Sequence, residues 1–162
     1  MTIGSLVPRS SQSADRHRIA SLISIRESLT ESRPATPEAV GIIRRSVAEY
    51  ASAVGIVGEK LDSVRLAVSE AVSNVVMHAY PGDPGQVHVT ARAVDGELWV
   101  LISDDGAGHN IQSKRPGLGW GLALMTDACD EFTLAERSTG GTEARMCFRI
   151  QADPQSVSPG DQ

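Results

Sequence analysis

Two stretches in the middle of the chain place apolar residues at three- and four-residue steps. The first stretch carries five such residues: Val40, Ile43, Val47, Ala51 and Val54. This spacing is typical of an amphipathic helix. Thr36-Pro37-Glu38 precedes it with a hydroxyl at the N-cap, a proline at the first helical position and an acid in the first turn. We therefore predict a helix that begins at about residue 37 and ends near Gly55.

The second stretch predicts a helix from about Glu59 to Ala79. Its apolar stripe consists of Leu61, Val64, Val68, Ala71 and Val75. The proline- and glycine-rich segment 81–85 follows and ends the helix. Residues 117–130 form a glycine-rich turn followed by an apolar run, which predicts a third helix.

Residues rich in Val, Leu, Ile and Thr predict two hairpins. Segments 86–94 and 97–103 flank Asp95-Gly96, which is a strong signal for a two-residue hairpin turn. Segments 132–138 and 142–150 flank a second glycine-rich turn at 139–141. Because hairpin strands are antiparallel, this order predicts an α+β fold: a two-layer sandwich of a mostly antiparallel sheet with helices on one face.

The two ends of the chain lack this patterning. Residues 1–34 are polar and rich in Ser and Arg, and we expect a flexible N-terminal extension there. Residues 152–162 contain mainly Pro, Ser, Gly, Asp and Gln, which indicates a disordered tail. A single domain over residues 35–151 is therefore expected.

Composition narrows the function classes. The chain has 162 residues, of which 41% are apolar and 4% aromatic, and its formal net charge is −5. The negative charge and the few aromatic residues disfavour a nucleic-acid platform or an anionic membrane surface as partner. The two cysteines form no CxxC pair, so neither a disulfide framework nor a structural zinc site is expected. No apolar run approaches the ~20 residues of a membrane span and no signal peptide is recognisable, so we expect a cytoplasmic protein.

Candidate chemistry begins on the second predicted helix. Glu70, Asn74 and His78 follow one another at four-residue steps, which stacks them on one helix face. The neighbours Ala67, Val68, Ala71, Val75 and Met77 are small or apolar almost all the way round, which predicts a nearly buried helix. A glutamate is rarely buried without a partner or purpose. A carboxamide oxygen can ligate Mg²⁺, and a carboxylate one turn away can accept a proton from an attacking hydroxyl. A solvated polar stripe is the plain alternative for this spacing.

Two glycine-rich turns add to this pattern. Asp104-x-Gly106-x-Gly108 stands at the end of a predicted strand, where the carboxylate can accept a hydrogen bond from an exocyclic amine and the glycines allow a ligand to approach the backbone. The alternative is a simple Asp-Gly turn. The second turn, residues 117–121, opens the third predicted helix, and free N–H groups at such a position bind phosphate. It is neither a Walker A loop nor a dinucleotide-binding fingerprint, and a purely structural turn is the alternative.

Together these elements resemble a known family. The segment Glu70–Tyr80, with the sequence EAVSNVVMHAY, resembles the N box of the GHKL (Bergerat-fold) ATPases in the form found in bacterial anti-sigma-factor serine kinases. The turn at 104–108 resembles their G1 box, the turn at 117–122 their G2 box, and Gly141-Thr142 their closing Gly-Thr pair. The resemblance covers about residues 34–150, and Trp120 departs from it where an aliphatic residue is common.

The resemblance implies an α/β sandwich that binds ATP between the helix layer and a mobile lid. It makes Glu70 the general base, Asn74 the ligand of Mg²⁺ and Asp104 the acceptor of the adenine amino group, with Thr142 near the adenine; His78 receives no catalytic role. The remaining implied nucleotide-site positions are Gly106, Gly108, Gly117, Gly119, Gly121 and Leu122. Lys114 or Arg115 can reach the γ-phosphate from the short lid, although a solvated loop cation is an equal alternative.

Three functions follow as hypotheses. The first is a serine/threonine kinase that phosphorylates an anti-sigma-factor antagonist of the STAS type and sequesters a sigma factor; related kinases are often homodimers. The second is a nucleotide-dependent binding module that sequesters a regulator without phosphorylating it. The third is the ATPase domain of a histidine kinase, which is disfavoured because few residues precede the first predicted helix. No direct contact with nucleic acid is expected.

Overall fold

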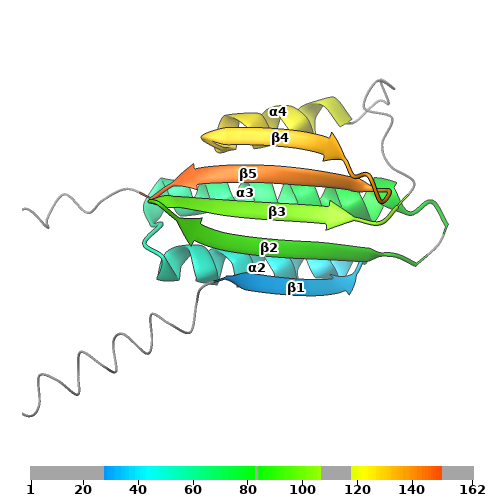
Figure 1. Cartoon of the computed structure of the whole chain (residues 1–162), viewed down its shortest axis with the longest axis horizontal. Helices are drawn as coiled ribbons and strands as arrows, with labels where there is room; N and C mark the ends of the chain where they lie inside the picture. The colour runs from blue at the N-terminus through cyan, green and yellow to red at the C-terminus, as the bar shows by residue number, and fades with distance from the viewer. Residues whose placement is uncertain (1–27, 83, 107–117, 151–162) are drawn as a thin grey trace, which may run out of the picture.

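A five-stranded antiparallel sheet carries helices on one face, as the computed structural model in Figure 1 shows. The structure describes residues 28–82, 84–106 and 118–150, with the backbone alone at 118–120. The strand order across the sheet is β1-β2-β3-β5-β4, and every neighbouring pair is antiparallel. The strands are β1 (Leu29–Pro34), β2 (Gln86–Val94), β3 (Glu97–Asp104), β4 (Glu131–Glu136) and β5 (Thr142–Arg149).

Three α-helices and one π-helical turn lie among the described residues. They are α2 (Pro37–Ala53), α3 (Gly58–Asn74), the π-helix η1 (Val75–Ala79) and α4 (Leu118–Ala128). The helix α3 packs against both α2 and α4, so the three form one layer over the sheet. The predicted α+β sandwich with helices on one face is confirmed. None of the described helices combines the length and the hydrophobicity that a membrane span requires.

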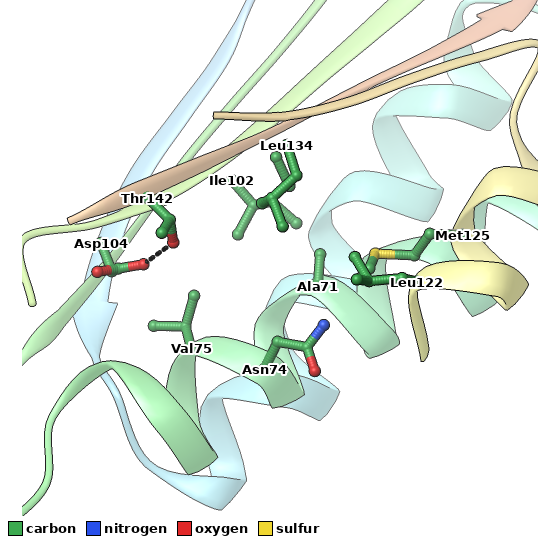
Figure 2. Close-up of a pocket in the computed structure, with 10 residues that line it drawn as sticks. Ala71, Asn74, Val75, Ile102, Asp104, Leu122, Met125, Leu134 and Thr142 are labelled. Atoms are coloured by element: carbon green, nitrogen blue, oxygen red, sulfur yellow. Dashed lines mark hydrogen bonds between the residues drawn. The ribbon is translucent and has the colours of Figure 1, made fainter. Parts of the chain in front are cut away.

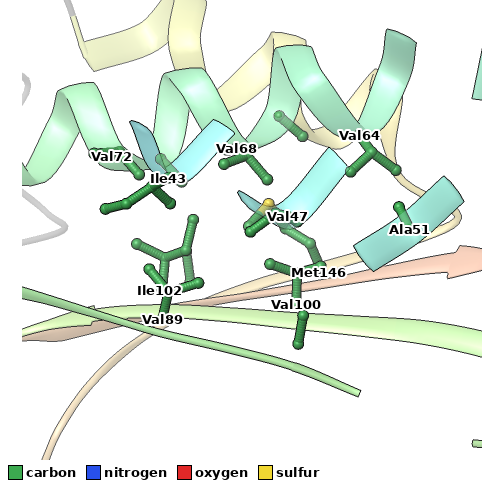
Figure 3. Close-up of a cluster of buried hydrophobic side chains, with 14 of the residues drawn as sticks. Ile43, Val47, Ala51, Val64, Val68, Val72, Val89, Val100, Ile102 and Met146 are labelled. Carbon is green, nitrogen blue, oxygen red and sulfur yellow. The ribbon is translucent and has the colours of Figure 1, made fainter. Parts of the chain in front are cut away.

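The hydrophobic core lies between the helix layer and the sheet (Figure 3). Alternate residues of β3 are buried, so this strand turns one set of side chains toward the helices. Fully buried aliphatic residues from both layers meet there: Ile43, Val47, Val64, Val68, Val72, Val89, Val100, Ile102 and Met146. Burying each of these side chains contributes about 1.5–3 kcal/mol. This packing fixes the position of α3 relative to β3 and β5. The polar candidate residues lie on these same elements.

The expected N-terminal extension is wrong for its last residues. Leu29–Pro34 form β1, which pairs along its whole length with β2 at the edge of the sheet. Leu29 is the one large apolar residue in this strand. Its sequence therefore lacks the alternating apolar pattern from which a strand is predicted. Residues 1–27 of the expected extension and the expected tail at 152–162 lie outside the described residues.

Candidate functional site

A pocket opens between α3, α4 and the inner face of the sheet (Figure 2). Its polar groups are separated: Asp104 and Thr142 lie together on the sheet at one end, and the Asn74 carboxamide lies apart from them on α3. Apolar side chains occupy the space between. The complete lining consists of Ala71, Asn74, Val75, Ile102, Asp104, Leu122, Met125, Leu134, Thr142 and Ala144.

Asp104 is the buried carboxylate of this pocket. It is the last residue of β3 and only 1% exposed. Its Oδ1 accepts a hydrogen bond of 2.9 Å from the Gly106 N–H, and its Oδ2 accepts one of 2.5 Å from the Thr142 hydroxyl. Because an ionised carboxylate offers about four acceptor positions, these bonds fix its orientation and leave capacity for a further donor.

Two glycines allow the backbone to close around Asp104. A Cβ on Gly106 would stand 2.2 Å from the carbonyl oxygen of Ala79, and a Cβ on Gly141 would stand 2.0 Å from the carbonyl oxygen of Asp104. Gly141 also has a φ of +81°, which favours glycine. Both positions therefore require glycine for contacts within the protein. For Gly106 this is a packing reason, and the expectation that it makes room for a nucleotide remains a prediction.

Glu70 and Asn74 are half-buried on the side of α3 that faces α4. A Cβ on Gly121 of α4 would stand 3.0 Å from Glu70 Oε2 and 3.7 Å from Asn74 Oδ1. Three of the predicted site residues are thus brought into one place. The regular helix gives way to the π-turn η1 directly after Asn74, and π-turns are frequent at functional sites.

The expectation that this helix is nearly buried is partly wrong. Ala67, Val68, Ala71 and Val75 are buried, as expected, but Met77 is 64% exposed. Met77 lies in η1, where the wider turn changes the face on which each residue lies. His78 is half-buried in the same turn.

The donor set suits a magnesium ion bound together with phosphates. The described residues contain no cluster of three His, Cys, Asp or Glu side chains that could form a metal cage. The Asn74 carboxamide lines the pocket and makes no hydrogen bond to another described residue. Mg²⁺ prefers oxygen ligands and is commonly held by one or two side chains, waters and substrate phosphates. Asn74 is therefore a fitting protein ligand for such an ion.

The remaining predicted site residues are distributed as follows. Leu122 lines the pocket from α4, and Gly119 lies in the first turn of that helix. Four predicted positions lie outside the described residues: Gly108, Lys114, Arg115 and Gly117. The assignment of a phosphate side thus rests, within the described part of the chain, on the first turn of α4.

Sequence reasoning missed a polar cluster next to Asp104, which consists of Asp105, His88, Arg137 and Tyr80. Asp105 accepts hydrogen bonds from Arg137 Nη1 at 2.7 Å and pairs with His88 Nε2 at 2.6 Å. Its N–H donates to the Tyr80 hydroxyl at 2.8 Å. The hydrogen bond with His88, followed by the one from Arg137, lowers the pKa of Asp105. No local sequence signal connects these residues, because the register of the strands brings them together.

Comparison with known proteins places the chain among ATP-using kinase domains. A family model described as a histidine kinase-like ATPase domain matches residues 33–148. The serine-protein kinase RsbW of Bacillus pumilus is 38% identical over 133 residues, which are 71% of this chain and 82% of that protein. The RsbW kinase of Bacillus subtilis is 37% identical over 87 residues, and the match spans about half of its length, 54%.

A solved structure agrees with the fold. The crystal structure of the RsbU and RsbW domains of a Mycobacterium tuberculosis protein superposes with a TM-score of 0.63 at 25% sequence identity. The match covers 81% of this chain and 34% of that one. Residues 33–148 of the family match include every described strand except the first part of β1 and the end of β5.

Proposed function

Because the chain belongs to the family of histidine kinase-like ATPase domains, we propose that it is an ATP-dependent protein serine/threonine kinase. Its substrate is an anti-sigma-factor antagonist of the STAS type, and in the absence of that antagonist it holds a sigma factor inactive. One observation carries the proposal: a buried hydrogen-bond acceptor, Asp104, lies at one end of a pocket that Asn74 lines from α3, with Glu70 one helical turn from Asn74.

The purine occupies the end of the pocket at Asp104. The Thr142 hydroxyl holds one oxygen of this carboxylate, and the adenine amino group donates to a remaining acceptor position. Apolar side chains such as Ile102 and Leu134 cover the faces of the ring. In this structure the pocket leaves only about 30 Å³ for the centres of water-sized molecules, so it is too narrow as it stands for a purine ring. Binding therefore requires the α4 side chains, chiefly Leu122 and Met125, to move away from α3.

The phosphates lie at the other end, between α3 and the first turn of α4. Backbone N–H groups at the start of a helix attract anions, and Gly119 and Gly121 add no side chain of their own to this turn. Asn74 would hold Mg²⁺, and the ion would neutralise part of the negative charge of the phosphates. Lys114 and Arg115 remain predicted ligands of the γ-phosphate.

Glu70 accepts the proton in the transfer step. The serine hydroxyl of the antagonist forms a bond to the γ-phosphorus, the bond from that phosphorus to the bridging oxygen of ADP breaks, and the hydroxyl proton goes to the Glu70 carboxylate. Glu70 lies next to Asn74 on the same helix face, so a hydroxyl that reaches the γ-phosphate is within reach of its carboxylate. Phosphoryl transfer depends mainly on positioning and electrostatic stabilisation, which this arrangement provides.

Labelled ATP and a purified antagonist test the proposal. The wild-type chain is expected to transfer label to a serine of the antagonist, and Glu70→Gln is expected to bind ATP but not to transfer. Glu59→Gln is the matched control, because Glu59 is an exposed glutamate in the first turn of the same helix. Tight antagonist binding without transfer by the wild type would instead support a nucleotide-dependent binding module.

The sigma-factor partner needs a separate experiment. A pull-down from the native cytoplasm, with and without ATP, is expected to retain a sigma factor, and addition of the antagonist is expected to release it. The homodimer typical of related kinases is measured by light scattering on the same sample. A sigma factor that binds equally well in the presence of the antagonist would contradict the partner-switching part of the proposal.

A further inference from the structure

The polar cluster next to Asp104 lies on the open face of the sheet. Successive strand residues point to opposite faces, so Asp104 faces the pocket while Asp105 faces away from the helices. From Asp105 the hydrogen bonds continue to His88 on β2, and the other ring nitrogen of His88 lies 2.8 Å from the Ser32 hydroxyl on β1. In the tautomer protonated at Nε2, one neutral imidazole satisfies both partners. The residue next to the purine acceptor is thus tied to β2 and β1, the two strands on one side of β3.

Arg137 ties the same residues to the other half of the sheet. Its Nη1 donates to the carbonyl oxygen of Asp104 at 2.7 Å and to Asp105 Oδ1 at 2.7 Å. A guanidinium nitrogen of this kind carries two hydrogens, one for each acceptor. Both acceptors belong to the turn that sets the direction of the Asp104 side chain.

Arg137 is itself held in the turn between β4 and β5. Its N–H donates to the carbonyl of Gly141 at 3.0 Å, and its carbonyl accepts from the N–H of Gly140 at 3.0 Å. The same turn delivers Thr142, whose hydroxyl holds the Asp104 carboxylate. The Arg137 side chain therefore links the end of β3 to the turn before β5, close to the hydrogen bonds that hold the Asp104 carboxylate.

From this geometry we infer that Arg137 is a positioning residue for the purine end of the nucleotide site, acting through the Asp104 carbonyl and through Asp105. The inference rests on the proposed function, since it assumes that Asp104 accepts the adenine amino group. A hydrogen bond between an amine and a carboxylate is directional, so a carboxylate held in place binds the base better than one that must be ordered on binding. Arg137 makes no hydrogen bond to Glu70 or Asn74, so we expect the phosphate end not to depend on it.

The experiment measures three affinities of the full chain: for ATP, for GTP, and for magnesium tripolyphosphate as a competitor. Arg137→Gln is expected to weaken ATP binding roughly 10-fold, which corresponds to about 1.4 kcal/mol, and to narrow the preference for ATP over GTP. Tripolyphosphate affinity is expected to be unchanged. Arg137→Lys is expected to recover most of the loss, because its ammonium group also has enough hydrogens for two acceptors.

Arg145→Gln is the matched control. Arg145 lies on β5 and is exposed, pairs with Glu143 at 2.6 Å, and makes no hydrogen bond to Asp104 or Asp105. This variant is expected to leave all three affinities at the wild-type value. A urea unfolding curve of each variant establishes that the affinities are measured on folded protein. If Arg137→Gln does not fold, Arg137→Lys and Asp105→Asn are measured instead, with a smaller loss of the same purine-specific kind expected.

The outcomes separate the two proposals. ATP binding by the wild type with unchanged affinity and purine preference in the Arg137 variants would overturn the inference and leave the proposed function intact. An equal loss of ATP and tripolyphosphate affinity would also overturn it, because Arg137 would then act on the whole site. Absence of ATP binding by the wild type would contradict the proposed function itself.

Discussion

A methyl group added at Gly121 is expected to change the activity of the protein without lowering its stability. In Gly121→Ala the new methyl group would stand 3.0 Å from Glu70 Oε2 and 3.7–3.8 Å from the two terminal atoms of Asn74. The contacts with Asn74 are ordinary van der Waals distances. The contact with Glu70 involves the far end of a flexible side chain, which can move by a few tenths of an ångström at small cost. Replacing glycine by alanine within a helix contributes about 0.5–1 kcal/mol of stability.

We therefore expect the free energy of unfolding of Gly121→Ala to equal or slightly exceed that of the wild type. The same methyl group occupies the space between α4 and the two polar side chains of α3, where the proposed phosphates lie. Misplacement of a reacting group by about 1 Å can reduce a rate about 100-fold, and we expect a loss of phosphoryl transfer of about 10- to 100-fold.

The assays are urea unfolding for stability and single-turnover transfer from labelled ATP for activity. Gly41→Ala is the matched control, because Gly41 also lies in a helix and its added Cβ would meet nothing closer than an arginine nitrogen at 4.0 Å. The control is expected to gain the same stability and to keep its transfer rate. If Gly121→Ala transfers phosphate as fast as Gly41→Ala, the space beside Glu70 is not part of the site and the reasoning is refuted.

Three further variants or treatments test other contacts. Thr142→Val removes the donor to the buried Asp104 carboxylate, so the free energy of unfolding is expected to fall by about 1–3 kcal/mol, whereas Thr142→Ser keeps the hydroxyl and should lose less. Burial opposes ionisation of Asp130, but its hydrogen bonds with Lys60 at 2.6 Å and with a backbone N–H outweigh burial and lower its pKa. The stabilisation by ionised Asp130 is thus fully present above the pKa of the unfolded chain and is lost as the pH falls through the lower pKa of the folded protein. Unfolding curves are expected to show Asp130→Asn less stable than the wild type by about 0.5–1 kcal/mol near pH 7, and this difference is expected to shrink below about pH 4. A difference that stays constant with pH would refute the pairing. Burial raises the pKa of the Cys147 thiol to about 11, and the residue is 0% exposed, so iodoacetamide at about pH 8 should label it only after unfolding; rapid labelling of the native protein, seen by mass spectrometry, would contradict this burial.

Local signals were sufficient for most of the fold. Proline at the start of α2 and the turn Asp95-Gly96 mark boundaries that depend on a few adjacent residues, and both predictions are confirmed. Asp95 and Gly96 have φ values of 52° and 80°, as a two-residue hairpin turn of this kind requires. The edge strand β1 could not be predicted, because its pairing with β2 supplies the order that its own sequence lacks.

In the candidate site, too, some contacts follow from local sequence pattern and others do not. The helical spacing of Glu70 and Asn74 predicted a shared face, and the structure places both against α4. The hydrogen bond between Thr142 and Asp104 joins residues 38 positions apart, and the contacts of Arg137 span a similar separation. Such contacts follow from strand register, which depends on the whole sheet, so a single sequence gives no means of deriving them from local pattern.

A crystal structure of the full chain with Mg²⁺ and a non-hydrolysable ATP analogue tests the central claim most directly. The account predicts the adenine amino group within hydrogen-bond distance of the Asp104 carboxylate, with Leu122 and Met125 displaced from α3. It also predicts a Mg²⁺ ion bound to Asn74 and to phosphate oxygens, with Glu70 beside the γ-phosphate. A nucleotide bound elsewhere, or an adenine that leaves Asp104 without contact, would contradict the account.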